Sequence, residues 1–130
     1  MLDTYHDNKV VASLVPAVQT ATLKGSTVDL AGYGSALMVV NTGAIAGSPA
    51  PSFGIAMQHS DTTTDGDFTN VAAADLLGSL PNALEDGTVY RQGYIGKKRY
   101  VRAVITKGSG TSIAAGAVFV LGSPHIAPVA

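Results

Sequence analysis

Histidine is the side chain best suited to metal ligation or to proton transfer near neutral pH, and this chain has three of them. His6, His59 and His125 are spread over almost the whole sequence, and none has the spacing of an HExxH motif. A zinc site needs its ligands to converge with a further donor, and cysteine, the other common zinc ligand, is absent. The spacing therefore predicts isolated histidines and no metal site built on them.

Three carboxylates lie close together in the segment SDTTTDGDF, at Asp61, Asp65 and Asp67. Such a cluster resembles a calcium site, but it lacks the D-x-[DN]-x-[DN]-G loop and the late bidentate glutamate of that motif. Asp and Gly also favour tight turns, so a solvated hairpin turn is the preferred interpretation. The only glutamate, Glu85, adjoins Asp86, and neighbours on a strand point to opposite faces, which is unsuited to an acid and base pair.

No motif for covalent or cofactor chemistry is found in the sequence. A nucleophile elbow, a P-loop and a complete dinucleotide fingerprint are all absent. The glycines of Gly32-Tyr33-Gly34 lack the strand-to-helix context in which they would cradle a phosphate. We therefore expect a binding protein with no cofactor, and not an enzyme.

The densest charge feature gathers five of the eight basic residues within twelve positions, at Arg91, Lys97, Lys98, Arg99 and Arg102, interleaved with Tyr90, Tyr94 and Tyr100. Basic groups with stacking aromatics are typical of single-strand nucleic-acid binders. Strand alternation would divide this set between two faces, however, and the net charge is −1. A basic hairpin suits an acidic protein surface equally well, so we expect a protein partner and no nucleic acid.

The composition points to lasting contact with a partner. Hydrophobic residues make up 46% of the chain and charged residues only 13%, about half the usual charged share of roughly 25%. A chain so poor in charge exposes apolar patches, which mark interaction sites. The N-terminus lacks the basic start of a signal peptide, and no apolar run reaches the ~18 residues that span a bilayer. We expect no membrane partner.

Local patterns predict an all-β fold with about eight strands. Apolar residues alternate in Phe53 to His59, in Arg99 to Thr106 and in Ile113 to Leu121, whereas Ala36 to Val40 is apolar on both faces, as in a strand buried from two sides. Asp65-Gly66 marks a hairpin turn, and Ala72 to Leu77 could form one helical turn. Short strands at this spacing predict an antiparallel, jelly-roll-like β-sandwich.

Both ends of the chain depart from this pattern. We expect residues 1–16 to form an N-terminal arm, residues 17–122 the sandwich and residues 123–130 an extended C-terminal tail; the alternative is that both ends pack on their own domain. Deletion of residues 1–16 should then weaken partner binding and leave the domain folded. The predicted partner contacts are the apolar residues of the arms and the basic turn: Val10, Val11, Leu14, Val15, Ile126, Val129, Lys97, Lys98 and Arg99.

Four segments carry a resemblance to a known family: VDLAGYGSALMVVNTG, SDTTTDGDFTNVAAADL, YRQGYIGKKRYVRAVIT and VFVLGSPHIAPV. They resemble small proteins encoded among the head genes of tailed bacteriophages and prophages, often beside the major capsid protein. The resemblance covers about residues 18–129, and the run GYIGKKRYVR is its most distinctive part. The first 16 residues do not match.

The resemblance implies a virion component, and its expected form is a capsid decoration or cement protein. Such proteins sit on the capsid exterior after synthesis in the host cytoplasm, commonly as homotrimers bound to the major capsid protein. Another structural virion part remains open, such as a tail, head-fibre or head-tail joining protein. A carbohydrate-binding module is a further alternative, since Tyr33, Tyr90, Tyr94 and Tyr100 could stack on sugar rings.

Overall fold

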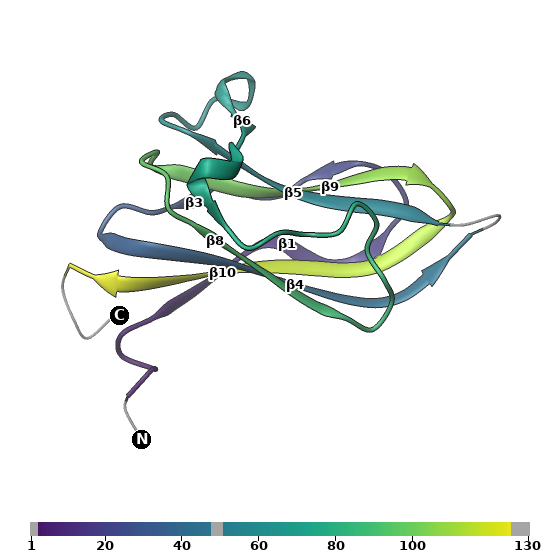
Figure 1. The fold of residues 1–130 in the computed structure, drawn as a ribbon, viewed down its shortest axis with the longest axis horizontal. Coiled ribbons are helices and arrows are strands. Elements are labelled where there is room, and N and C mark those ends of the chain that lie inside the picture. Colours follow the sequence, from purple (N-terminus) through teal and green to yellow (C-terminus); the bar gives the residue numbers. More distant parts are fainter. Residues whose placement is uncertain (1–2, 48–50, 126–130) are drawn as a thin grey trace.

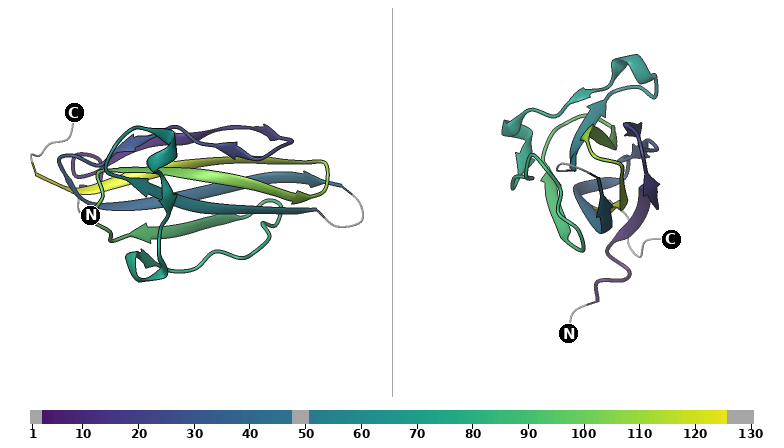
Figure 2. Two further views of the ribbon diagram at one scale, coloured as in Figure 1. Left: turned by 90° about the horizontal axis from the view of Figure 1, so that it is seen from above. Right: turned by 90° about the vertical axis from the view of Figure 1, so that its right-hand side faces the viewer.

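A computed structural model of the chain describes residues 3–47 and 51–125, and it is all-β. Ten strands form two antiparallel sheets of a sandwich, which are seen as the upper and lower layers in Figure 1 and from the end in Figure 2. The only helical pieces in the described residues are two single turns of 3₁₀ helix, η1 (Asp65–Asp67) and η2 (Ala73–Asp75). None of these helices is long enough to cross a membrane.

The first sheet, sheet A, has the order β1-β10-β4-β8-β7. Its four long strands pair in registers that place residues with the same orientation opposite one another, for example Phe119 beside Met38 and Val40 beside Tyr90. The strands are β1 (Lys9–Gln19), β4 (Tyr33–Ala46), β7 (Leu76–Leu77), β8 (Val89–Tyr94) and β10 (Ser112–Pro124).

The second sheet, sheet B, has the order β2-β9-β5-β6, with β3 pairing on the same side of β9 as β2. Its strands are β2 (Leu23–Lys24), β3 (Val28–Asp29), β5 (Ser52–Ser60), β6 (Thr69–Asn70) and β9 (Tyr100–Ser109). If β2 and β3 count as one interrupted strand, the principal strands follow the β1-β10-β4-β8 and β2/β3-β9-β5-β6 order of a jelly roll. The sequence predicts about eight strands, two fewer than the structure has, because two-residue strands such as β6 and β7 are too short to show an alternating pattern.

The core lies between the sheets and is built from the alternate residues that the sequence identified. Phe53, Ile55 and Met57 of β5 face inward, as do Val101, Ala103 and Ile105 of β9, and none of the six is more than 7% exposed. The inward series of β10 runs Ile113, Ala115, Ala117, Phe119 and Leu121, and it is equally buried. Period-two alternation thus confirms the predicted inward faces of these strands.

The expected N-terminal arm is wrong for residues 9–16, because β1 begins at Lys9 and pairs with β10 along its whole length. The boundary drawn after residue 16 falls inside this strand. Pro16 is tolerated there because β1 is an edge strand with irregular register around Leu14, and because Gly116 leaves room for the proline ring, which a Cβ atom would approach to 2.8 Å. Deletion of residues 1–16 would therefore damage the sandwich itself.

The predicted helical turn at residues 72–77 is present in part. η2 covers Ala73–Asp75, after which the chain straightens into β7 and pairs with β8. The hairpin predicted around Asp65-Gly66 is also found, since β5 pairs with β6 across a loop that contains η1. These two connections lie over sheet B and at the free edge of sheet A.

We predict that Leu14→Ala lowers the free energy of unfolding by about 2–5 kcal/mol, because it empties a core position. Leu14 is 1% exposed, whereas Leu23, at the edge of sheet B, is 45% exposed. The matched variant Leu23→Ala should therefore cost less than about 1 kcal/mol. Urea denaturation measures both; equal losses would show that Leu14 does not belong to the core.

Candidate partner-binding site

One end of the sandwich brings together segments that are far apart in the sequence. The start of β1 lies beside the end of β10, where Lys9 pairs with Leu121, and the end of β10 lies beside the start of β4, where Pro124 pairs with Tyr33. The amide of His125 donates a hydrogen bond of 2.8 Å to the carbonyl of Gly32. Figure 1 shows the start of β1 and the end of β10 at this end.

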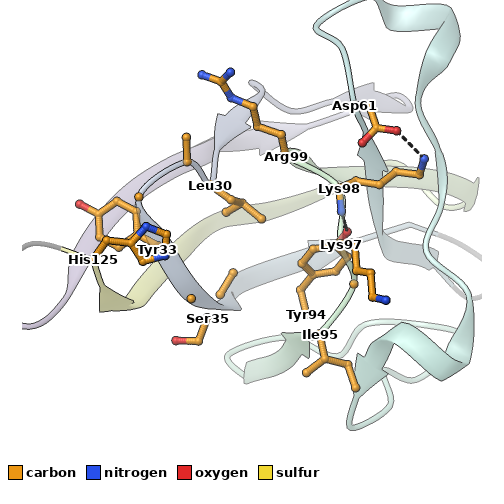
Figure 3. Close-up of a pocket in the computed structure, with 15 residues that line it drawn as sticks. Leu30, Tyr33, Ser35, Asp61, Tyr94, Ile95, Lys97, Lys98, Arg99 and His125 are labelled. Atoms are coloured by element: carbon orange, nitrogen blue, oxygen red, sulfur yellow. Dashed lines mark hydrogen bonds and ion pairs between the residues drawn. The ribbon is translucent and has the colours of Figure 1, made fainter.

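A cavity of about 520 Å³ opens at the same end (Figure 3). Its walls come from the start of β4, the end of β8 and the turn between β8 and β9, together with His125 after β10. The labelled side chains in Figure 3 are Leu30, Tyr33, Ser35, Asp61, Tyr94, Ile95, Lys97, Lys98, Arg99 and His125. The cavity therefore combines positive charge, aromatic rings and small polar groups.

The basic turn, Lys97–Arg99, is held in place by two ion pairs. The ammonium of Lys98 lies 2.9 Å from the Asp61 carboxylate, and the guanidinium of Arg99 binds Asp29 through two hydrogen bonds of 2.9 Å. Asp61 raises the pKa of Lys98, and Arg99 lowers the pKa of Asp29. Exposed pairs of this kind contribute little to stability, but they fix where the turn points.

Lys97 differs from its two neighbours in the turn. It is exposed, it lines the cavity, and no ion pair of its ammonium is found with any residue that the structure describes. Lys97 is therefore the cation of this turn that is available to an incoming acidic group without first breaking an internal pair.

A buried hydrogen-bond chain supports the turn from below. The backbone amide of Lys98 donates to the Tyr94 hydroxyl at 3.0 Å, and that hydroxyl lies 2.9 Å from Nδ1 of His59. The Tyr94 hydroxyl oxygen accepts from the amide and shares a second hydrogen bond with Nδ1 of His59, whose direction follows the tautomer of the ring. Burial lowers the pKa of His59 and raises that of Tyr94, so both rings are neutral at pH 7.

The three clustered carboxylates point to separate partners and do not form a common ligand set. Asp61 pairs with Lys98, Asp65 with Lys24 and Arg102, and Asp67 accepts from the Thr62 hydroxyl at 2.6 Å. Arg102 and Lys24 lower the pKa of Asp65. Within residues 3–47 and 51–125, no three His, Asp or Glu side chains gather as metal ligands.

The predicted contact residues separate into four groups. Val10 and Val15 are 63% and 68% exposed on β1, and Lys97, Lys98 and Arg99 form the basic turn at the cavity. The prediction is wrong for Leu14, which is a core residue, and Val11 packs against the core from the same strand. Ile126 and Val129 lie outside the described residues.

Sequence reasoning missed the pairing of His59 with Tyr94, which reaches across the two sheets. The burial of His59 could be predicted from the sequence, because His59 continues the alternating inward series of Phe53, Ile55 and Met57. In the structure its side chain is 8% exposed. Nothing in the sequence pairs it with Tyr94, because that contact depends on how sheet B lies over sheet A. His125, expected in the tail, also lines the cavity.

Comparison with known proteins finds a shared fold. No family model matches the chain, and no curated protein matches its sequence. The SPBc2 prophage-derived protein YomS matches with a TM-score of 0.52 and 16% identity, over 95% of this chain and 99% of that one. A chain from the infectious bursal disease virus Gx strain structure matches at a TM-score of 0.45 and 13% identity, over 88% of this chain and 31% of that one. The likeness to YomS shows a common fold from end to end.

We predict that stability falls as the pH drops from about 7.5 to about 5. The lowered pKa of buried His59 means that the unfolded chain binds a proton more readily, so the stabilising contribution is complete above the unfolded pKa and is lost as the pH falls through the folded one. The melting temperature, measured by thermal unfolding at several pH values in this range, gives the change in stability per pH unit.

The variant His59→Asn keeps a side chain that can donate to or accept from the Tyr94 hydroxyl and removes the titrating ring, so stability should change less with pH than in the unmodified chain. The control His6→Asn replaces an exposed histidine and should keep the original slope. A slope that survives in His59→Asn would assign the pH dependence to another group.

Proposed function

We propose that this chain is a capsid decoration protein of a tailed bacteriophage, which binds the outer face of the major capsid protein and stabilises the shell. The observation that carries the proposal is that the start of β4, His125 after β10 and the basic turn meet around one cavity at one end of the jelly roll. Two likenesses support it: the sequence segments resemble head-gene proteins of phages and prophages, and the fold matches prophage-derived YomS along nearly all of both chains.

The end with the cavity is the surface that we assign to the capsid. Lys97 presents there a cation that pairs with no carboxylate of residues 3–47 or 51–125, while Lys98 and Arg99 are held in fixed positions by Asp61 and Asp29. A turn that is already positioned loses little freedom on binding, which favours association with an acidic surface. Residues 3–8, which precede β1 at this end, would lengthen the contact without enlarging the core.

Stabilisation of the shell follows from binding to the assembled lattice. A protein that binds only the assembled shell shifts the equilibrium between free and assembled capsid subunits towards assembly. If it contacts two capsid subunits at once, neither subunit can leave the shell without breaking that contact. Copies joined as a homo-oligomer, which we propose to be a trimer, gain further from multivalency on a repeating surface. The function therefore needs contact area and geometry, and no chemical step.

Two alternatives make different demands on the molecule. A tail, head-fibre or head-tail joining protein could share this fold, but it would be present in about a dozen copies or fewer on a particle whose tail has such symmetry. A sugar-binding module would need accessible rings, and of the two tyrosines that line the cavity, Tyr94 is only 5% exposed. The cavity thus offers Tyr33 alone for stacking on a sugar.

We predict that purified particles carry this protein in hundreds of copies, and that Lys97→Glu lowers its occupancy by roughly tenfold at low salt. The charge reversal places an acid where an acidic capsid surface docks, and added salt should narrow the difference. Quantitative gel densitometry against the major capsid protein measures both the copy number and the occupancy.

The control Lys107→Glu makes the same charge change in the exposed second half of β9, away from the cavity, and should leave the occupancy unchanged. About a dozen copies per particle would identify a joining or tail component instead. Equal occupancy of Lys97→Glu and Lys107→Glu on the particles would show that the basic turn does not contact the capsid.

A further inference from the structure

The outward face of sheet A is almost as apolar as its inward face. Leu37 and Val39 of β4 and Val118 and Val120 of β10 point away from the core and are half-buried, while Val10 and Val18 of β1 are 63% and 65% exposed. Among the described residues of the four long strands, Arg91 is the charged residue paired into this face, opposite Val39. A sheet that has solvent on one side normally alternates apolar with polar residues, and this sheet does not.

The outer face of sheet B is instead partly covered by the chain itself, and its charged side chain Arg102 is only 5% exposed. Arg102 lies there with its guanidinium bonded to Gln58 and Asp65 and 4.1 Å from the centre of the Phe68 ring. The loop that carries Asp65 and Phe68 folds over this face, and Lys24 closes it with a second ion pair to Asp65. The chain therefore covers part of the outside of sheet B with its own loop and leaves the outside of sheet A without such a cover in the described residues.

The apolar face is large enough to be the main part of an interface. Four strands at about 4.8 Å spacing and about seven residues at about 3.3 Å each give a projected area of about 440 Å². A stable interface buries about 800 Å² per partner, so this face supplies more than half of one before the relief of its side chains is counted. Small residues, among them Ala114 and Gly116, form the floor of a groove of about 630 Å³ between Val18 and Val39.

We infer that a second copy of this chain covers the outward face of sheet A. In a rotationally symmetric oligomer, residues near the axis meet their own counterparts, so any charge there would face a like charge. A face without charge at its centre meets that requirement, whereas docking on an acidic or basic partner surface would favour complementary charge on this side as well. The inference rests on the proposed function for its biological role and names the surface that joins the copies.

The test is the mass of the purified full chain in solution, by sedimentation velocity over a range of concentrations. The unmodified chain should sediment at a multiple of 13.2 kDa. The variant Val39→Asp should raise the dissociation constant by about 100-fold, because it buries an unpaired carboxylate in an apolar contact. The control Thr106→Asp adds the same charge to an exposed position on sheet B and should leave the mass unchanged.

A second variant guards against misfolding of Val39→Asp. Replacement of Val18, Val39 and Val118 together by threonine keeps the β-branched shape and adds only hydroxyl groups, and it should weaken association by about tenfold or more while the circular dichroism spectrum stays that of a folded β protein. Unchanged association in this folded triple variant would overturn the inference.

The same experiment separates this inference from the proposed function, because it uses no capsid. A chain that is monomeric at every concentration overturns the second copy as occupant; if Val39→Asp then also loses attachment to particles, the capsid covers the face instead. A chain that oligomerises through sheet A but never attaches to particles would retain this inference and refute the decoration role.

Discussion

Sheet A has apolar side chains on both faces, while the part of the chain that the structure describes provides a second layer for only one of them. Burial of Met38, Val40 and Phe119 against sheet B provides the core, and the hydrophobic effect makes that packing the dominant favourable term in folding. The same term acts on Leu37, Val39 and Val118, which have no such layer above them in the described residues. The need to cover this second face connects the fold of the chain with its proposed role.

The jelly-roll topology places the basic turn and the apolar face on different surfaces of the molecule. Its strand order brings the start of β1, the end of β10 and the turn after β8 to one end, which leaves the broad face of sheet A free for another contact. Tyr94 and His59 tie the turn to both sheets, so the basic end is fixed to the core. A small protein can in this way join its own copies through one surface and a lattice through another.

Sequence patterns predicted the regular parts of the fold and missed the irregular ones. The inward residues of β5, β9 and β10 follow simple alternation, so their burial could be read directly. The sequence predicts an arm where the structure has β1, because register shifts on both sides of Leu14 break the alternation of this strand and Pro16 interrupts it further. The bond from His59 to Tyr94 could not be predicted, because it joins residues 35 positions apart on different sheets.

The strand Ala36 to Val40 was predicted to be buried from two sides, and the structure buries one side of it. Ala36, Met38 and Val40 are at most 7% exposed, while Leu37 and Val39 between them are half-buried on the open face. Burial of the second side on assembly would reconcile the prediction from the sequence with the exposure of Leu37 and Val39 in the isolated chain. On sheet B the loop that carries Asp65 and Phe68 covers Arg102, so among the described residues the open apolar face belongs to sheet A.

The most direct measurement is the labelling rate of a single thiol in this chain, which has no cysteine of its own. Val18→Cys places the thiol on the outward face of sheet A, and Thr106→Cys places it on sheet B. If sheet A is covered on assembly, maleimide should react slowly with Val18→Cys in the assembled protein and quickly after dilution to monomers, while Thr106→Cys reacts quickly in both. Equal, rapid labelling of Val18→Cys in both states would contradict the account.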